Sequence, residues 1–278
     1  MNKNLPRFAQ QNLVSRSARN KLSGIYILWY REILIYSRNS VKFFTSIFLP
    51  LLFLVFFGTG LKTIFPLVSL PYDFAEFFFP GILALSVTTM ALSSTMSIVW
   101  DREFGFLKEI LVSPVPRSYI ALGKILGAAS TALIEGALLL LAAPYLGINF
   151  SFKIFLASLA IIFLIAYGMA ALGIFLTARI KRTESFTILL QMIITPMVFL
   201  SGAFFPINNS PHWMVSLSKY NPLTYGINSL RWVILSHTLP ASTISQLTTN
   251  GFIPSLSIFI LFTIIITILS LQLFKRLT

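Results

Sequence analysis

The chain has 278 residues, of which 56% are hydrophobic and 10% are charged, whereas soluble domains carry about 25% charged residues. This composition excludes a soluble globular protein and predicts an all-α integral membrane protein. A formal net charge of +13 would suggest nucleic-acid binding in a soluble protein, but these basic residues flank apolar runs, where they orient helices and meet anionic headgroups. We therefore expect membrane lipids, and no nucleic acid, as partners.

Residues 1–42 form a basic tail with eight Lys and Arg residues and one acidic residue. We expect this tail to be cytoplasmic and distinct from a transmembrane domain over 43–278. An organellar transit peptide is a second interpretation, because it has a similar composition. The chain has no cysteine, which excludes disulfides, thiolate metal ligands and a cysteine nucleophile.

Within the tail, residues 25–38 are too short to cross a bilayer. On a helical wheel Arg31 and Arg38 share one narrow stripe, while Trp29 lies on the opposite, mostly apolar side. This pattern predicts an interfacial helix on the inner leaflet, with Glu32 as an exception on the apolar side. A basic anchor with interfacial aromatic residues is the alternative.

Six apolar runs are long enough to cross a bilayer core of about 30 Å, which takes about 20 helical residues. They span about residues 43–61, 77–100, 119–148, 154–178, 186–205 and 252–274. If both termini lie on one side, 17 of the 21 Lys and Arg residues fall on that side. Because basic loop residues mark the cytoplasmic side, we predict six transmembrane helices with both termini cytoplasmic.

A polar segment, DREFGFLKEILVSPVPR (101–117), separates the second and third spans and holds six of the chain's 29 charged residues. Charges of both signs suit docking to a complementary protein surface. Gly105 lets the backbone turn, while Pro114 and Pro116 end a helix and redirect the chain. A solvated loop with anchoring charges is the alternative interpretation.

Glu135 lies near the middle of the third span, where an ionised carboxylate is costly and an ionisable residue is a functional candidate. We interpret it as a candidate for the substrate path, and a satisfied structural contact is the alternative. Gly123 and Gly127 in the same span predict close helix packing and not a site. Pro50 and Pro196 predict bends in the first and fifth spans.

The segment between the fifth and sixth spans, 206–251, has two charged residues but many aromatic and aliphatic ones. Its amphiphilic pieces at about 212–218 and 223–236 are too short to cross, which predicts re-entrant or interfacial helices on the outer side. We interpret His212 and His237 as interfacial polar residues, and we expect no metal site.

Several catalytic motifs are missing from the sequence. There is no Gly-x-x-x-x-Gly-Lys-Ser/Thr phosphate-binding loop, no His-Glu-x-x-His and no Gly-x-Ser-x-Gly. We therefore expect neither enzymatic activity nor a cofactor in this chain.

Two segments resemble ABC-2 type permeases, the membrane subunits of bacterial exporters such as those for anthracyclines and nodulation factors. The first is the polar segment 101–117, which is similar to the signature loop of the family. The second is 201–231, which carries SGAFFP, PHW and NPLTY, followed by LR. Together with the six-span layout, these similarities extend over nearly the whole chain.

The resemblance implies a half-transporter. Two copies, or one copy and a homologue, form the membrane part, and a separate ATPase subunit binds ATP and Mg. In the family the polar loop forms a coupling helix that sits in a cleft of the ATPase, beside the N-terminal interfacial helix. The candidate coupling residues are Asp101, Arg102, Glu103, Phe104, Gly105, Leu107, Lys108, Glu109, Leu111, Pro114 and Arg117. The candidates in the outer segment are Phe205, Pro206, Trp213, Asn221, Pro222, Tyr225 and Arg231.

The expected function is therefore that of the permease subunit of an ATP-driven exporter. An amphiphilic or lipid-linked substrate is favoured, because the spans contain no charged lining beyond Glu135. A passive channel or proton-coupled carrier that uses Glu135 is the alternative, and a membrane scaffold without transport is a third. Isoleucine strongly outnumbers valine, which is typical of AT-rich coding. The chain is similar to permeases of cyanobacteria and red-algal plastids, so either a bacterial plasma membrane or a plastid membrane is expected.

Overall fold

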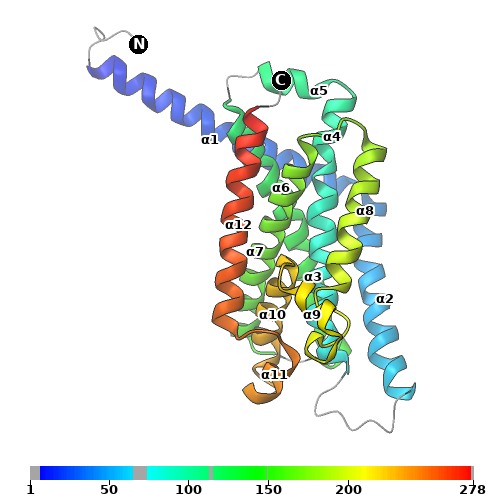
Figure 1. Cartoon of the computed structure of the whole chain (residues 1–278). Coiled ribbons are helices and arrows are strands. Elements are labelled where there is room, and N and C mark those ends of the chain that lie inside the picture. The colour runs from blue at the N-terminus through cyan, green and yellow to red at the C-terminus, as the bar shows by residue number, and fades with distance from the viewer. Residues whose placement is uncertain (1–6, 65–73, 113–114, 149, 277–278) are drawn as a thin grey trace.

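The computed structural model describes residues 7–64, 74–112, 115–148 and 150–276. Within these ranges the chain consists of α-helices and short 3-10 helices joined by turns and loops, and no strand occurs among these residues. The long helices run side by side and form an elongated bundle (Figure 1). The prediction of an all-α fold is confirmed.

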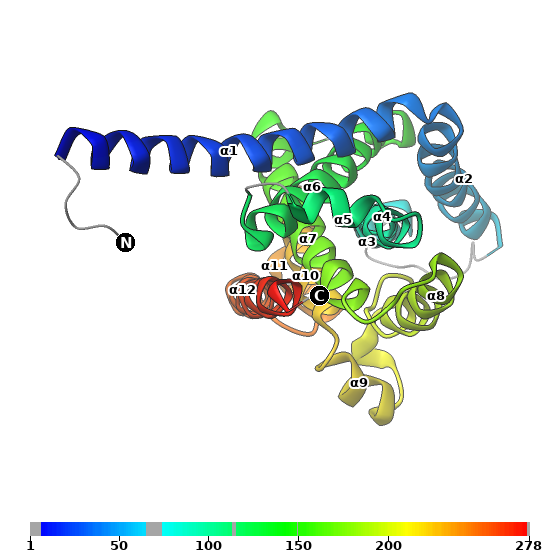
Figure 2. The same cartoon turned by 90° about the horizontal axis from the view of Figure 1, so that it is seen from above.

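The N-terminal helix α1 (Arg7–Arg38) is longer than the helix expected over 25–38. It lies across one end of the bundle, whereas α2 (Ser40–Ile64) runs along the bundle (Figures 1 and 2). The described parts of these two helices are bent by 76° at Asn39. The side-chain oxygen of Asn39 accepts a hydrogen bond from the backbone N–H of Lys42 at 2.9 Å, which caps the start of α2.

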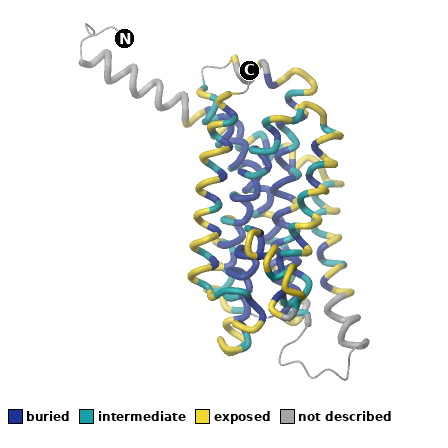
Figure 3. The backbone as a smooth tube through the Cα atoms, viewed as in Figure 1, coloured by how far each residue is buried: buried dark blue, intermediate teal, exposed yellow. Residues whose placement is uncertain are grey.

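The centre of the bundle is formed by α3 (Phe74–Ser94), α4 (Met96–Glu103), α6 (Arg117–Ala142) and α7 (Phe152–Thr177). The break between α3 and α4 is one residue long, so the two helices continue one another. The C-terminal helix α12 (Phe252–Lys275) packs mainly on α7. Buried residues concentrate in this central group, and the outward faces of α2 and α12 are largely exposed (Figure 3).

The remaining elements lie mostly at the two ends. α5 (Phe106–Val112) lies at the same end as α1 and the C-terminal end of α12 (Figure 1). A 3-10 helix, η1 (Ala143–Leu146), follows α6. α8 (Thr183–Phe199) runs along the bundle, and at the end opposite α5 it is followed by η2 (Ile207–Asn209), α9 (His212–Ser218), α10 (Pro222–Leu235) and α11 (Ala241–Leu247).

Each of the six predicted spans coincides with a helix, but only some of these helices are long and apolar enough to count as spans. Four helices among the described residues do so: Ala75–Glu103, Arg117–Tyr145, Phe152–Thr177 and Phe252–Lys275. The number of candidate spans rises to five if the bent pair of α1 and α2 is counted as one span. α8 is apolar but has 17 residues. The count of six and the cytoplasmic position of the termini therefore stay predictions.

Small residues let the central helices approach closely. A Cβ atom added at Gly136 of α6 would lie 2.7 Å from Ile162 of α7 and 2.9 Å from Val87 of α3. At these distances Ile162 and Val87 would have to shift to admit a side chain, so glycine lets the three helices meet closely.

Three helices that coincide with predicted spans contain a proline, and bends were expected at two of these prolines. Pro50 lies within α2, Pro196 within α8 and Pro80 within α3. All three helices continue through the proline, and the bends expected at Pro50 and Pro196 stay predictions.

Candidate functional site

The candidate coupling segment forms a sharp corner, which we call the α4–α5 corner (residues 101–112). α4 ends at Glu103, and Gly105 adopts a φ of +85°, in the left-handed region that glycine enters without a Cβ penalty. No atom lies within 4 Å of a Cβ built at Gly105, so it is the backbone angle, and not crowding, that favours glycine. After this turn α5 leaves the direction of α4 and lies across the end of the bundle (Figure 1).

Three apolar side chains of the corner are exposed among the side chains that the structure describes. Phe104 is 72% exposed, Phe106 57% and Val112 86%, and the carboxylate of Glu109 is exposed beside them. Leu107 is buried and anchors α5. Exposed aromatic rings at one end of a membrane protein form a surface suited to a partner, because aromatic residues are enriched at the cores of protein interfaces.

Three predicted coupling residues cannot be placed in this surface. The side chains of Lys108 and Leu111, and the whole of Pro114, lie outside the described residues. Arg117 begins α6, is partly buried, and donates a hydrogen bond to the backbone carbonyl of Lys275 at 3.2 Å. It therefore ties the corner's return segment to the end of α12.

Two charged residues of the corner bind the neighbouring helices. Arg102 donates hydrogen bonds to the carbonyls of Thr177 at 2.9 Å and Ile180 at 2.6 Å, at the end of α7. Glu103 accepts hydrogen bonds from the backbone N–H of Thr183 at 3.0 Å and from its hydroxyl at 2.5 Å. A carboxylate at a helix N-terminus stabilises the helix, so Glu103 caps α8.

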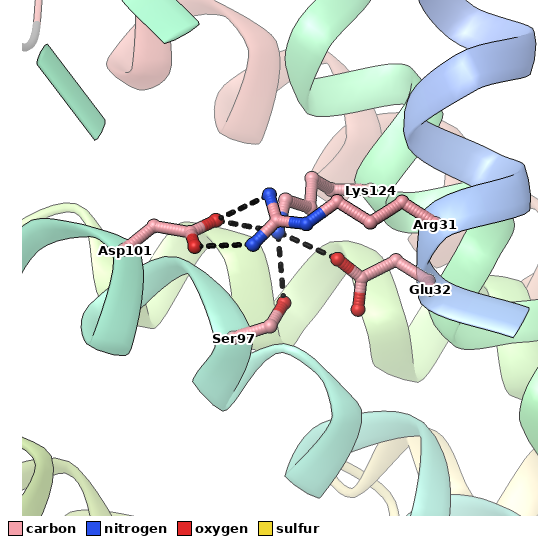
Figure 4. Close-up of polar contacts among 5 residues, drawn as sticks. All are labelled: Arg31, Glu32, Ser97, Asp101 and Lys124. Carbon is pink, nitrogen blue, oxygen red and sulfur yellow. Dashed lines mark hydrogen bonds and ion pairs between the residues drawn. The ribbon is translucent and has the colours of Figure 1, made fainter. Parts of the chain in front are cut away.

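Below the corner, four charged side chains form a compact cluster, shown in Figure 4. Arg31 of α1 binds both carboxylate oxygens of Asp101, at 2.5 and 3.1 Å. Lys124 of α6 lies between Asp101 at 2.8 Å and Glu32 of α1 at 2.6 Å. The Lys124 ammonium also donates a hydrogen bond to the hydroxyl of Ser97 of α4 at 3.0 Å. We call these five residues the charge cluster.

The charge cluster changes the expected role of Asp101. We expected this carboxylate to offer its charge to a partner protein, but it is buried and bonded to Arg31 and Lys124. In the sequence Glu32 is an exception on the apolar side of the expected interfacial helix, and Lys124 is one of the 17 Lys and Arg residues counted on the side of the termini. A buried acid needs a buried base, and a charge on the apolar side of α1 was the one signal that could have suggested this pairing.

α1 packs on α6 along the glycines that the sequence singled out. A Cβ added at Gly123 would lie 3.0 Å from the Cβ of Leu28, and one at Gly127 would lie 2.6 Å from the Cβ of Glu32. The indole N–H of Trp29 donates a hydrogen bond to the hydroxyl of Ser130 at 2.9 Å. The prediction of close packing is confirmed, and the partner is the N-terminal helix.

Glu135 lies in α6 and is 2% exposed, and one of its oxygens, Oε2, has no hydrogen-bond partner among the described residues. It lines a cavity of about 370 Å³ between α2, α3 and α6, together with Lys42 and Ser46. No group of acidic or histidine residues that could hold a metal ion occurs in the described part of the chain.

The outer segment is held together by a buried arginine. Arg231 of α10 is 1% exposed, and its guanidinium donates hydrogen bonds to the carbonyls of Gly202 at 3.0 Å and Leu247 at 3.2 Å. It also lies over the ring of Phe77 of α3, 4.2 Å from the centroid, which is a cation–π geometry. Arg231 therefore joins α10 to α3, to α11 and to the chain after α8.

Two further predicted residues of this segment form internal hydrogen bonds. The side-chain oxygen of Asn221 accepts a hydrogen bond from the backbone N–H of Leu223 at 3.0 Å, which caps α10. The side-chain N–H of Asn221 donates a hydrogen bond to the carbonyl of Met197 at 2.6 Å. The hydroxyl of Tyr225 donates to the carbonyl of Lys219 at 2.7 Å, and burial raises the pKa of this phenol. These contacts fix the entry into α10, which packs on α3, α7 and α12.

The other predicted residues of the outer segment are less deeply placed. Phe205, Pro206 and Pro222 are partly buried, whereas Trp213 on α9 is 61% exposed. Tyr220, which was not predicted, is 87% exposed. Aromatic residues of this kind are enriched where a membrane meets water. The helices expected at 212–218 and 223–236 are thus present as α9 and α10, and α11 was not predicted.

Comparison with known proteins gives concordant results. Residues 23–235 match the family described as ABC-2 type transporter. A protein named transport permease ycf38 from Cyanophora paradoxa is 28% identical over 240 residues, or 85% of this chain and 82% of that protein. Nodulation protein J of Rhizobium leguminosarum bv. trifolii is 29% identical over 190 residues, or 68% and 72% of the two chains. Inner membrane transport permease YadH of Escherichia coli K12 is 26% identical over 169 residues, or 59% and 64%.

Proposed function

Because this chain belongs to the ABC-2 type transporter family and is a multi-pass membrane protein, we propose that it is the permease subunit of an ATP-driven exporter. Energy comes from a separate ATPase chain, which carries ATP and Mg. The observation that most strongly supports this proposal is the α4–α5 corner, whose exposed phenylalanines lie at the end of a bundle that has no ATP-binding motif of its own.

The contacts of the α4–α5 corner can transmit a movement of the ATPase to the transmembrane helices. Phe104, Phe106, Val112 and Glu109 form the surface that meets the ATPase. One turn behind this surface, Asp101 is bonded to α1 through Arg31 and to α6 through Lys124. Because buried, mutually bonded charges resist separation, a push on the corner moves α4, α1 and α6 together. Such rigid-body motion is the general basis of alternating access.

The permease functions as a pair, either two copies or one copy with a homologue, and places an ATPase under each corner. The cargo is an amphiphilic or lipid-linked molecule, because the cavity at Glu135 is lined by both apolar and polar residues. The membrane is a bacterial plasma membrane or a plastid membrane, in which homologues with this family's domain occur.

The exporter proposal predicts that the corner surface controls coupling. In vesicles that contain this chain and its cognate ATPase, Phe106→Ala and Glu109→Lys should each lower ATP-dependent transport about tenfold, the effect of losing an interface residue worth about 1.4 kcal/mol. Transport is measured with a fluorescent amphiphile, and ATPase binding by co-purification. Glu103→Arg is a poorer test, because it also removes the cap of α8.

The control is Phe152→Ala, which truncates a phenylalanine that is 77% exposed at the start of α7. Its transport should match that of the unmodified chain. Normal coupling in the Phe106→Ala and Glu109→Lys variants would contradict the proposed ATPase contact.

A proton-coupled carrier or passive channel remains the second candidate, because Glu135 is buried beside a cavity with an unbonded oxygen. The same vesicles separate the two functions. Flux that follows a pH gradient without ATP, and that is lost in Glu135→Gln, would favour the carrier and contradict the exporter.

A further inference from the structure

The cavity between α2, α3 and α6 has the character of a ligand site. Its volume of about 370 Å³ lies within the range of about 300–1,000 Å³ that small-molecule sites occupy. Most of its wall is apolar, from residues such as Leu49, Phe53 and Ile82, and hydroxyls of Ser46 and Ser86 interrupt it. Apolar walls with a few converging polar groups are typical of sites that bind amphiphiles.

Two charged residues line this cavity, and neither has an ion-pair partner within 4.0 Å among the described residues. Glu135 lines the cavity, and its Oε2 atom is buried and has no hydrogen-bond partner among the described residues. Lys42 contributes an ammonium group at the start of α2, nearer the end that carries the charge cluster. A buried polar atom without a partner is unfavourable, so a ligand whose groups bond Glu135 and Lys42 gains binding energy.

The two charges define the ligand that fits. The carboxyl group of Glu135 calls for a cationic N–H donor, and the ammonium of Lys42 calls for an anionic acceptor. A ligand with only an anionic head would satisfy Lys42 and leave the carboxyl group of Glu135 without a donor. A ligand with a quaternary ammonium would balance the charge but has no N–H to donate.

We propose that this cavity binds the headgroup of a zwitterionic amphiphile with a primary ammonium, of the phosphoethanolamine type, and that its hydrocarbon chains lie along the apolar face of α2. The ammonium bonds Glu135 and the phosphate bonds Lys42. The inference names the substrate class for the permease proposed above and in that respect rests on it, but the binding itself requires no ATPase.

A second cavity suggests how the head group enters. This cavity, of about 220 Å³, is lined by Glu32, Ser97 and Trp100, and it shares Lys42 and Ser93 with the larger one. The two cavities therefore adjoin beside Lys42, and the smaller one reaches the charge cluster. A polar head can thus pass from the inner end of the bundle to Glu135 along hydroxyl-bearing residues.

The test uses the purified full-length chain in detergent micelles and a photoactivatable ethanolamine phospholipid as the probe. Unlabelled phospholipids with ethanolamine, choline and glycerol headgroups compete for crosslinking, and mass spectrometry identifies the labelled peptides. We expect ethanolamine lipid to compete at about tenfold lower concentration than glycerol lipid, with choline lipid in between, since a hydrogen bond to a charged group is worth about 1.5–3 kcal/mol. The crosslinks should fall in α2, α3 or α6.

Substitutions assign each part of the head to a residue. Glu135→Gln should abolish the preference for ethanolamine over choline lipid. Lys42→Gln should lower the binding of both lipids about tenfold and keep that preference. Thr89→Phe narrows the cavity without altering its charge and should lower the binding of all three lipids. Glu184→Gln and Lys153→Gln, at exposed positions that do not line the cavity, are the matched controls.

Equal competition by the three lipids, or an unchanged ethanolamine preference in Glu135→Gln, would overturn the inference. If ATP-dependent transport is then still observed, the exporter proposal survives and this inference alone fails. If the lipid preference is found but vesicles show no ATP-dependent transport, the cavity assignment stands and the exporter proposal fails.

Discussion

At the scale of single residues, Lys124 has the most consequential position in the molecule. Its side chain is 3% exposed, and its ammonium bonds Glu32, Asp101 and Ser97, which belong to α1 and α4. With Arg31, the cluster contains two cations and two anions, so its net charge is zero and every charge has an opposite partner. Such a cluster is stable only when it is complete, because a lone buried charge is strongly unfavourable.

Replacement of this lysine should therefore destabilise the protein. Lys124→Met leaves Glu32 buried without its cation, and we expect a loss of about 3–5 kcal/mol, the usual cost of breaking a buried ion pair. Thermal unfolding in detergent measures the effect, and Glu32→Gln in the same chain should restore part of the stability, because the uncompensated charge is gone.

The control for this prediction is Lys153→Met. It removes one positive charge from an exposed position at the start of α7. A melting temperature equal to that of the unmodified chain is expected for the control, and the same result for Lys124→Met would refute the structural role of the charge cluster.

At the scale of elements, the fold depends on how closely α1 lies on α6. α1 crosses the end of the bundle and bends by 76° into α2, so its position determines where α2 begins (Figure 2). Its outer face carries exposed residues such as Tyr26, Ile27 and Tyr30, which suit the membrane surface. Its inner face meets Gly123 and Gly127, and this contact carries both the Trp29 hydrogen bond and the charge cluster.

A large side chain in this contact should displace α1. In Gly127→Leu the first added carbon would already lie 2.6 Å from Glu32, so α1 must shift and the hydrogen bond between Trp29 and Ser130 should break. Overpacking of this kind costs about 1–3 kcal/mol. Trp29 becomes more accessible, which quenching of its fluorescence measures once the other tryptophans have been replaced by phenylalanine.

The matched control is Ala157→Leu, which adds a large side chain at an exposed position of α7. It should change neither quenching nor stability. Unaltered quenching in Gly127→Leu would mean that α1 does not depend on this contact.

At the scale of the whole molecule, the two ends differ in character. One end carries the corner, the charge cluster and α1, and the other carries α9, α10 and α11 (Figure 1). This segregation agrees with the loop charges, which place most Lys and Arg residues at the first end. If α1 and the C-terminal end of α12 lie on the same side of the membrane, the chain must cross the membrane an even number of times from α2 to α12.

The natural absence of cysteine makes the topology directly testable. Single cysteines at Glu109, Arg182 and Ser216 occupy exposed positions in α5, before α8 and in α9. In inside-out vesicles an impermeant maleimide should label the first two and not Ser216→Cys, and right-side-out vesicles should give the reverse. Labelling of Arg182→Cys and Ser216→Cys from the same side would show that the 17-residue α8 does not cross.

The sequence by itself determined the class, most of the helices and the position of the polar segment at 101–117. Hydrophobic length, charge asymmetry and Gly105 are local properties, and local properties are readable along a chain. The helices at 212–218 and 223–236 were predictable for the same reason. Their apolar segments can be read from the sequence, and these segments are too short to cross the membrane.

Only the tertiary structure decided which charges meet. Glu32 and Lys124 are 92 residues apart, and Arg31 and Asp101 are 70 apart, so nothing in either neighbourhood names the partner. The same holds for Arg231 with Gly202, and for the cavity that brings Lys42 to the side of Glu135. A buried charge must be compensated, but the chain fold alone selects the residue that compensates it.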